Sequence, residues 1–227
     1  MCGRYGSEIS PEQLSLLLEV PEEQTRGVSP RYNIAPTQSA PVARLHGSGA
    51  REIAWLRWGL VPSWAPDASR AARLINARAE TVAQKPSYRE AYRARRCLVP
   101  ADGFYEWRRA GSARIPTHFQ RTGGLPFAFA GLWERWAGSA GAGPLETFTV
   151  LTTEANKLVG EVHDRMPVIL VGEALDRWMD PGAAQGALEE LLRPFPAEEM
   201  ERWEVSIRVN AVANDDALCR ARQPLLL

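Results

Sequence analysis

Alternating apolar and polar positions predict a chain built mostly from short strands. Residues 40–45 and 51–58 read as two strands around the glycine-rich turn 46–49, a predicted hairpin. Residues 101 and 102 are predicted to turn between two further strands, and residues 139–144 form a flexible turn. The further predicted strands are 96–100, 103–107, 117–120, 126–133, 146–153, 168–171 and 203–209.

A smaller number of segments predict helices. Ser10 is a suitable N-cap, Pro11 suits the first helical position, and Gln13 completes a capping box, so a helix begins here. Its apolar stripe is Leu14, Leu17 and Leu18. The other predicted helices are 87–95, 173–179 and 184–192.

Three segments have a less regular pattern. Residues 32–37 predict an irregular loop held by Pro36, and residues 58–64 form an aromatic, proline-rich segment that is too rigid for a linker. Residues 74–81 predict a short strand or turn. With no linker or repeat, we expect one α+β domain over residues 1–227: β-rich, with a curved sheet or barrel-like core and flanking helices.

Composition narrows the class of protein. The chain has 227 residues, 45% hydrophobic and 24% charged, which is ordinary for a globular protein. It has no apolar stretch of the roughly 20 residues that a membrane helix needs, and no basic-then-apolar signal pattern. The three cysteines include no Cys-x-x-Cys pair. We therefore expect a cytoplasmic monomer with no membrane, metal or cofactor.

Charge is balanced overall but unevenly distributed. Between residues 70 and 121 there are twelve basic and four acidic residues, whereas residues 173–204 hold nine acidic and three basic ones. Nearly all the basic residues are arginines, which bind phosphates in a bidentate manner. A GC-rich genome would explain arginine over lysine but not the clustering. The basic segment predicts a surface that binds a polyanion.

The first residues carry the most distinctive chemistry. Removal of Met1 would leave Cys2 with a free α-amine and a thiol, two nucleophiles on adjacent carbons. An aldehyde can take the amine as a Schiff base, and the thiol can then close a five-membered thiazolidine ring. Gly3 leaves room for a substrate, and Arg4 adds a cation suited to a phosphate. The alternative is that Cys2 lies inert near a disordered terminus.

Four internal residues are further candidates. Trp64 and Trp107 lie among polar residues and could stack on bases, although core packing explains most of the eight tryptophans. Alternation places Glu106 on the strand face opposite Trp107, where a raised pKa would suit a general acid or base; a surface salt bridge is the alternative. His163 precedes a buried strand beside an Asp and an Arg, which favours a site.

Six short segments, in order, resemble the SOS-response-associated peptidase (SRAP) family, whose members shield abasic sites in single-stranded DNA. They run from residue 1 to about residue 171, and the last fifty residues match little. The segments are Met1–Tyr5, Tyr32–Thr37, Trp58–Trp64, Asn76–Thr81, Arg96–Trp107 and His163–Pro167.

The resemblance implies the family's barrel-like fold and assigns roles to residues. Cys2 matches the nucleophile that forms the thiazolidine with the aldehyde of the abasic sugar, while Asn76, Glu106 and His163 match active-site polar residues. His163 would open the sugar ring, Glu106 would transfer protons, and Asn76 would orient the sugar or the amine. We expect DNA contacts from Gly3, Arg4, Asn33, Pro36, Trp64, Arg78, Trp107, Thr152 and Arg165.

The family name would also fit self-processing of Met1 or a lyase-like release of the crosslink. Two other functions remain open on the residues. One is an N-terminal-nucleophile amidohydrolase such as a glutaminase, which would leave the basic cluster without a task. The other is a passive single-stranded DNA-binding module in which Cys2 is inert.

Overall fold

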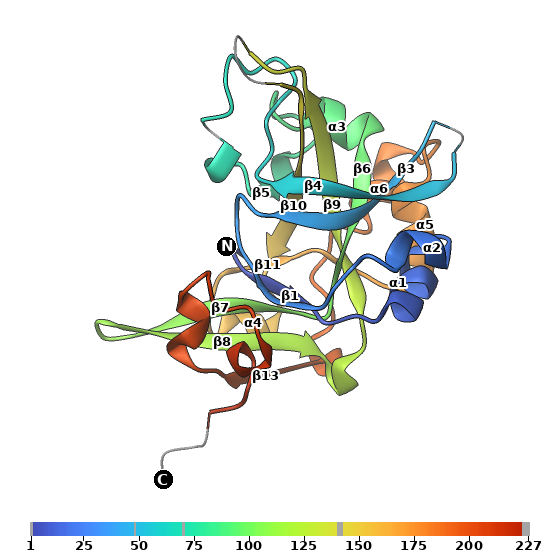
Figure 1. Cartoon of the computed structure of the whole chain (residues 1–227). Helices are drawn as coiled ribbons and strands as arrows, with labels where there is room; N and C mark the ends of the chain where they lie inside the picture. Colours follow the sequence, from blue (N-terminus) through green and yellow to red (C-terminus); the bar gives the residue numbers. More distant parts are fainter. Residues whose placement is uncertain (1, 48, 70, 140–142, 224–227) are drawn as a thin grey trace.

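Two β-sheets form the framework of the protein (Figure 1). The computed structural model describes residues 2–47, 49–69, 71–139 and 143–223. The smaller sheet has five strands in the order β13-β8-β7-β1-β2, and the larger has eight. The strands are β1 (Tyr5–Ser7), β2 (Arg31–Ile34), β3 (Ser39–Leu45), β4 (Arg51–Trp58), β5 (Asn76–Arg78), β6 (Arg96–Ala101), β7 (Gly103–Ala110), β8 (Ala113–Arg121), β9 (Phe127–Trp136), β10 (Leu145–Glu154), β11 (Arg165–Pro167), β12 (Ile169–Leu170) and β13 (Met200–Glu204).

The larger sheet closes on itself. Strand β10 pairs with both β4 and β9, so the pairings β10-β4-β3-β6-β9-β10 complete a ring of five strands. Strands β5 and β11 extend β10 beyond the ring, and β12 is added to β9. The prediction of an α+β, β-rich fold with a barrel-like core is therefore confirmed.

Most of the short helices cover one side of this ring, whereas α4 (Lys157–Gly160) lies beside β13 of the smaller sheet (Figure 1). The other α-helices are α1 (Pro11–Leu18), α2 (Glu22–Thr25), α3 (Arg89–Ala94), α5 (Glu173–Met179) and α6 (Gln185–Glu189). Leu14, Leu18, Tyr92 and Trp178 of these helices pack in one core cluster with ring residues such as Leu98. No helix among the described residues is both long and apolar enough to cross a membrane.

A second core joins the ring to the smaller sheet. Tyr5 of β1 contacts Trp58 and Phe129 of the ring edge-on, with ring centroids 5.2 and 5.6 Å apart. Phe104 of β7 meets Phe129 in the same cluster, which also contains the buried Cys2. The N-terminal strand β1 is therefore the part of the smaller sheet whose Tyr5 packs against the ring.

Local signals predicted several elements correctly. Helix α1 begins with the predicted capping box: the Ser10 hydroxyl accepts from the Gln13 amide at 3.2 Å, and the Gln13 side chain accepts from the Ser10 amide at 3.1 Å. Strands β3 and β4 form the predicted hairpin. Helix 87–95 appears as α3, and helix 184–192 shortens to α6.

Other predictions were wrong at positions whose structure depends on pairing with strands distant in the sequence. Residues 32–34 of the predicted loop 32–37 belong to strand β2, which pairs with β1. The predicted turn at Asp102 joins no hairpin, because β6 and β7 belong to different sheets and the Asp102 amide donates to Gly6 instead. The predicted strand 203–209 ends at Glu204, and Ile207–Asn210 is a 3₁₀ helix. The predicted strand 168–171 begins earlier and is split into β11 and β12.

Two irregular segments complete the comparison. Residues 76–81 combine the short strand β5 with a 3₁₀ helix, Ala79–Thr81. The predicted turn 139–144 includes residues 140–142, which lie outside the described residues.

Gly103 tests the packing between β7 and β8. A Cβ atom at Gly103 would lie 2.3 Å from Nε2 of the buried His118 and 2.8 Å from the Phe119 carbonyl oxygen. We expect Gly103→Ala to lower the free energy of unfolding by about 1–3 kcal/mol, measured by urea denaturation, because the core would be overpacked. Gly186→Ala in α6 is the control, since nothing lies within 4 Å of its Cβ position, and it should not destabilise. Equal stability of the two variants would contradict the prediction.

Candidate functional site

The N-terminal segment brings Cys2 to the boundary between the two sheets. Strand β1 pairs antiparallel with β7, and the Tyr105 amide donates to the Arg4 carbonyl at 3.0 Å. This pairing carries the residues before β1 along β7 toward Glu106. Cys2 is fully buried there, and its thiol lies 3.8 Å from the Arg4 carbonyl oxygen. Burial, with the charge of Glu106 adding to it, raises the pKa of the Cys2 thiol far above its ordinary range.

Asn76 fixes the backbone of Cys2. It begins β5, which runs parallel to β10, and its Nδ2 donates to the Cys2 carbonyl oxygen at 2.7 Å. Its Oδ1 is buried and has no hydrogen-bond partner in the described structure. A buried, unpaired carboxamide oxygen is costly and is suited to receive a donor from a substrate.

Glu106 is the buried carboxyl of this site. It is 4% exposed, because it lies on the inner face of β7. Burial raises the pKa of Glu106, while the nearby charge of His163 opposes the shift and that of Asp164 adds to it. The alternative of a surface salt bridge is wrong, since Arg108 pairs with Glu204 instead. A carboxyl whose pKa is raised by burial keeps its proton to a higher pH, which suits a general acid or base.

His163 is held so that its Nδ1 is satisfied in either protonation state. The Arg165 amide donates to Nδ1 at 3.0 Å, and the Asp164 carboxylate lies 2.9 Å from the same nitrogen. A neutral imidazole can accept from Arg165, and a protonated one can donate to Asp164. Gain or loss of a proton therefore leaves neither form without a partner.

Arg165 lies next to these residues but is already occupied. Its guanidinium donates to both carboxylate oxygens of Glu80, at 2.6 and 3.0 Å, and to the Thr152 carbonyl at 2.5 Å. The hydrogen bonds from Arg165 lower the pKa of Glu80. Thr152 is buried, and its hydroxyl donates to the Ala77 carbonyl at 3.5 Å. Thr152 supports this arrangement from inside the protein.

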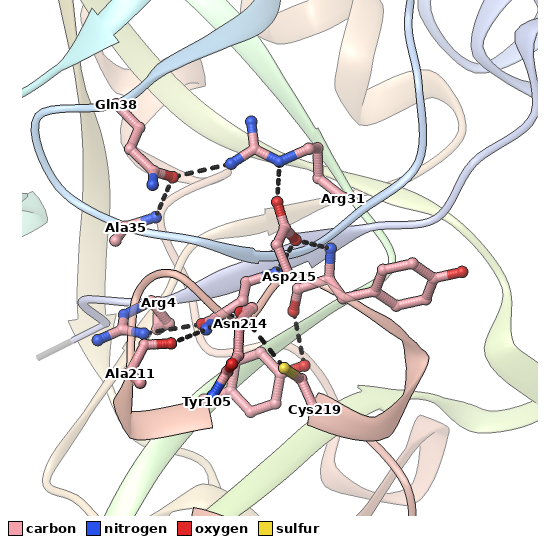
Figure 2. A network of polar contacts seen from close by, with 11 residues as sticks. Arg4, Arg31, Ala35, Gln38, Tyr105, Ala211, Asn214, Asp215 and Cys219 are labelled. Atoms are coloured by element: carbon pink, nitrogen blue, oxygen red, sulfur yellow. Dashed lines mark hydrogen bonds and ion pairs between the residues drawn. The ribbon is translucent and has the colours of Figure 1, made fainter. Parts of the chain in front are cut away.

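Arg4 and Asn33 belong to a network with the C-terminal segment, 205–219 (Figure 2). Arg4 donates to the Asn33 side chain at 2.8 Å and to the Val209 carbonyl at 2.7 Å. The fully buried Asn33 amide donates to the carbonyls of Val209, Ala211 and Asn214. This side chain is directed into the protein, so the predicted DNA contact from Asn33 is replaced by a role in holding Arg4.

The remaining predicted DNA-binding residues lie nearer the surface. Trp64 is 64% exposed in the segment after β4, Arg78 at the end of β5 is exposed, and Pro36 is half-buried after β2. Gly3 and Trp107 line a groove of about 360 Å³, where the Trp107 indole donates to the Asn210 side chain at 2.8 Å. The structure thus separates a buried cluster around Cys2 from exposed groups around it.

Two contributors to the site were not predicted from the sequence. Glu80 orients Arg165 from the 3₁₀ helix after β5. Asp215 accepts from the amides of Tyr32 and Asn33, at 2.6 and 2.8 Å, and pairs with Arg31. The polar run Asn214–Asp216 was the available cue, since such residues often bond backbone amides. No group of three potential metal ligands occurs in the part of the chain that the structure describes.

The family model "SOS response associated peptidase (SRAP)" matches residues 1–212. The chain belongs to the SRAP family. Among relatives in this family, "Abasic site processing protein YoqW" of Bacillus subtilis is 41% identical, covering 95% of this chain and 96% of the relative. "Abasic site processing protein HMCES" of Gallus gallus is 32% identical, covering 96% of this chain and 77% of that protein.

Solved structures share the SRAP fold seen here. A protein from Bacteroides thetaiotaomicron superposes with a TM-score of 0.86 at 26% identity, covering 98% of this chain and all of that one. A phage-related protein from Bordetella bronchiseptica gives a TM-score of 0.71 at 30% identity, covering 90% and 94%.

Glu106 should lower stability near neutral pH. Its pKa is raised in the folded protein, so ionisation there disfavours folding, whereas a carboxyl protonated in both states has no such effect. Near neutral pH we expect Glu106→Gln to melt at the same temperature as the wild type or higher. The difference should shrink as the pH falls toward about 4.3, the ordinary pKa of a glutamate.

Glu134→Gln is the control for this experiment. Glu134 is also buried, but it accepts from Arg95 at 2.9 Å, so its loss should cost about 1–3 kcal/mol. Thermal unfolding followed by circular dichroism measures both variants. A Glu106→Gln protein as unstable as Glu134→Gln at neutral pH would contradict the assignment of Glu106 as a destabilising buried acid.

Proposed function

We propose that this protein processes abasic sites by forming a covalent thiazolidine crosslink between Cys2 and the open-chain sugar in single-stranded DNA. The form that reacts begins at Cys2, after removal of Met1. The observation that carries the proposal is the cluster itself: Asn76 holds the Cys2 carbonyl at 2.7 Å, and the pairing of β1 with β7 carries the buried Cys2 toward the buried Glu106. The names of the relatives support the same substrate.

The chemistry is a condensation that releases one water molecule. The amine of Cys2 adds to the aldehyde carbon, and the carbinolamine loses water to give an imine. The thiol sulfur then adds to the imine carbon while the thiol proton passes to the nitrogen. The product is a five-membered ring with new carbon–nitrogen and carbon–sulfur bonds, and no oxidant or reductant is needed.

Proton transfers set the proposed roles of Glu106 and His163. The buried Cys2 thiol is neutral before reaction, because its pKa is raised, so ring closure needs a base. Glu106 can accept that proton and return it, since its own pKa is raised by burial. His163 would transfer the proton that opens the cyclic sugar, with Nδ1 satisfied in both charge states.

Exposed groups around the cluster would hold the strand. Arg78 and Trp64 offer a cation and an aromatic face. Arg165 could contact a phosphate if the phosphate displaced Glu80, which now accepts two of its hydrogen bonds. Such contacts position DNA without reading its sequence, so the protein would act on any abasic single strand. We propose that it does so as a monomer in the cytoplasm.

The same groups suggest how a crosslink would be released. Return of a proton to sulfur through Glu106 would reopen the ring to the imine, and water would then regenerate the amine and the aldehyde. In this proposal, the peptidase activity in the family name would be the removal of Met1. Any lyase activity would be this release of the crosslink.

Cys2→Ser tests the proposed bond. Serine keeps the amine but lacks a comparable nucleophile at ring closure, so we expect a borohydride-reducible imine and loss of the stable adduct. Denaturing gel electrophoresis on abasic single-stranded DNA measures both species. Cys219→Ser is the control, because the Cys219 thiol only donates to the Asn214 carbonyl, which a hydroxyl can also do. An equally durable adduct from Cys2→Ser would refute the thiazolidine.

The same assay separates the other functions. A passive binding module would show salt-sensitive binding that is indifferent to abasic sites and gives no adduct. An amidohydrolase would release ammonia from small amides without DNA.

An uncleavable N-terminal extension tests the need for the free amine. In the extended protein the nitrogen of Cys2 is an amide whose lone pair is delocalised into the carbonyl, so it cannot form an imine. We expect no stable crosslink, while affinity for intact single-stranded DNA changes little. Mass spectrometry must show that the extension is present. A normal crosslink yield from the intact extended protein would show that the α-amine is not the nucleophile.

A further inference from the structure

The β7–β8 hairpin projects from the body of the protein as an arm (Figure 1). The strands pair to the end, where Ala110 faces Ala113 across the turn Gly111–Ser112. Arg109 and Arg114 are directly opposite each other near this end, and both are exposed.

Two cations in this register repel each other. Like charges directly opposite on neighbouring strands destabilise a sheet. Within the described ranges, neither Arg109 nor Arg114 has a carboxylate within ion-pair distance. Arg108, which points to the other face of β7, pairs with Glu204 at 2.5 Å. One face of the arm therefore carries a repulsion that a bound anion would relieve.

This face of β7 lies opposite that of Glu106, and a groove connects it to Gly3 and Arg4 beside Cys2. Trp107 and Arg109 share a face of β7, because side chains alternate along a strand. Trp107, Arg114 and Asn210 line one groove with Gly3 and Arg4, and the Arg4 guanidinium lies 5.8 Å from the centre of the Trp107 ring. The groove therefore leads from the residue after Cys2 to Arg114 of the arm, which lies directly opposite Arg109.

We propose that Arg109 and Arg114 bind the phosphodiester backbone of the DNA strand that flanks the reacting sugar. This inference rests on the function proposed above and extends its binding site by two residues. A phosphate between the two guanidinium groups would accept hydrogen bonds from both and remove their repulsion. Contacts of this kind increase the affinity for DNA regardless of its base sequence. They do so only for DNA strands that are long enough to reach the arm.

The test compares two abasic oligonucleotides, a long one and a minimal one with a single nucleotide on each side of the site. Binding is measured in the Cys2→Ser background, where no stable crosslink interferes. For Arg109→Gln/Arg114→Gln we expect the Kd of the long oligonucleotide to rise about three- to tenfold, while that of the minimal one is unchanged. The salt dependence of log K should fall by about 0.7 for each lost phosphate contact.

Arg108→Gln is the matched control, since it removes the same charge from the opposite face of the arm and should leave both Kd values unchanged. The double variant should melt no lower than the parent, because it removes the repulsion. An unchanged Kd for the long oligonucleotide, an equal loss for both lengths, or an equal loss in Arg108→Gln would overturn the proposal.

A separate outcome identifies failure of the underlying function. If the protein with its native Cys2 forms no stable adduct on either oligonucleotide, the thiazolidine proposal fails. If it forms the adduct but the double variant binds the long strand normally, only the arm proposal fails.

Discussion

The buried side chain of Asn33 joins the two ends of the chain. Its amide donates to three carbonyls of the C-terminal segment, at 2.6 to 3.2 Å, and its oxygen accepts from Arg4. A buried polar group left without partners costs about 1–3 kcal/mol, so each partner constrains the others. Arg4 lies two residues from Cys2. The position of Arg4, close to the proposed nucleophile, therefore depends on residues about two hundred positions later.

Local sequence signals predicted the positions of strands and helices better than they predicted which strands pair with each other. The capping box of α1 and the β3–β4 hairpin depend on residues close in sequence. By contrast, the path of the chain at Asp102 depends on the Gly6 carbonyl and on Arg220, which donates to Asp102 at 2.6 Å. Periodicity cannot identify such partners, because it reports which face of a strand is buried and not which sheet the strand joins.

Side-chain chemistry alone suggested only part of the proposed site. Cys2 and Glu106 stood out by reactivity and by strand alternation, and the family resemblance added Asn76; the structure brings all three together. Asn33 shows the limit of this reasoning: its motif was recognised, but its partners lie in the last twenty residues, where the sequence offered no motif. Glu80 was missed for a similar reason, since only the fold brings it to Arg165.

In the proposed crosslink the DNA is attached at Cys2, three residues before β1, an inner strand with β2 on one side and β7 on the other. Hydrogen bonds in antiparallel pairs lie perpendicular to the strands, so tension along β1 loads the bonds on both sides together instead of one after another. A motor or polymerase that pulls on joined DNA would thus apply shear to the centre of a sheet. The same strand that presents the nucleophile would serve as a mechanical anchor.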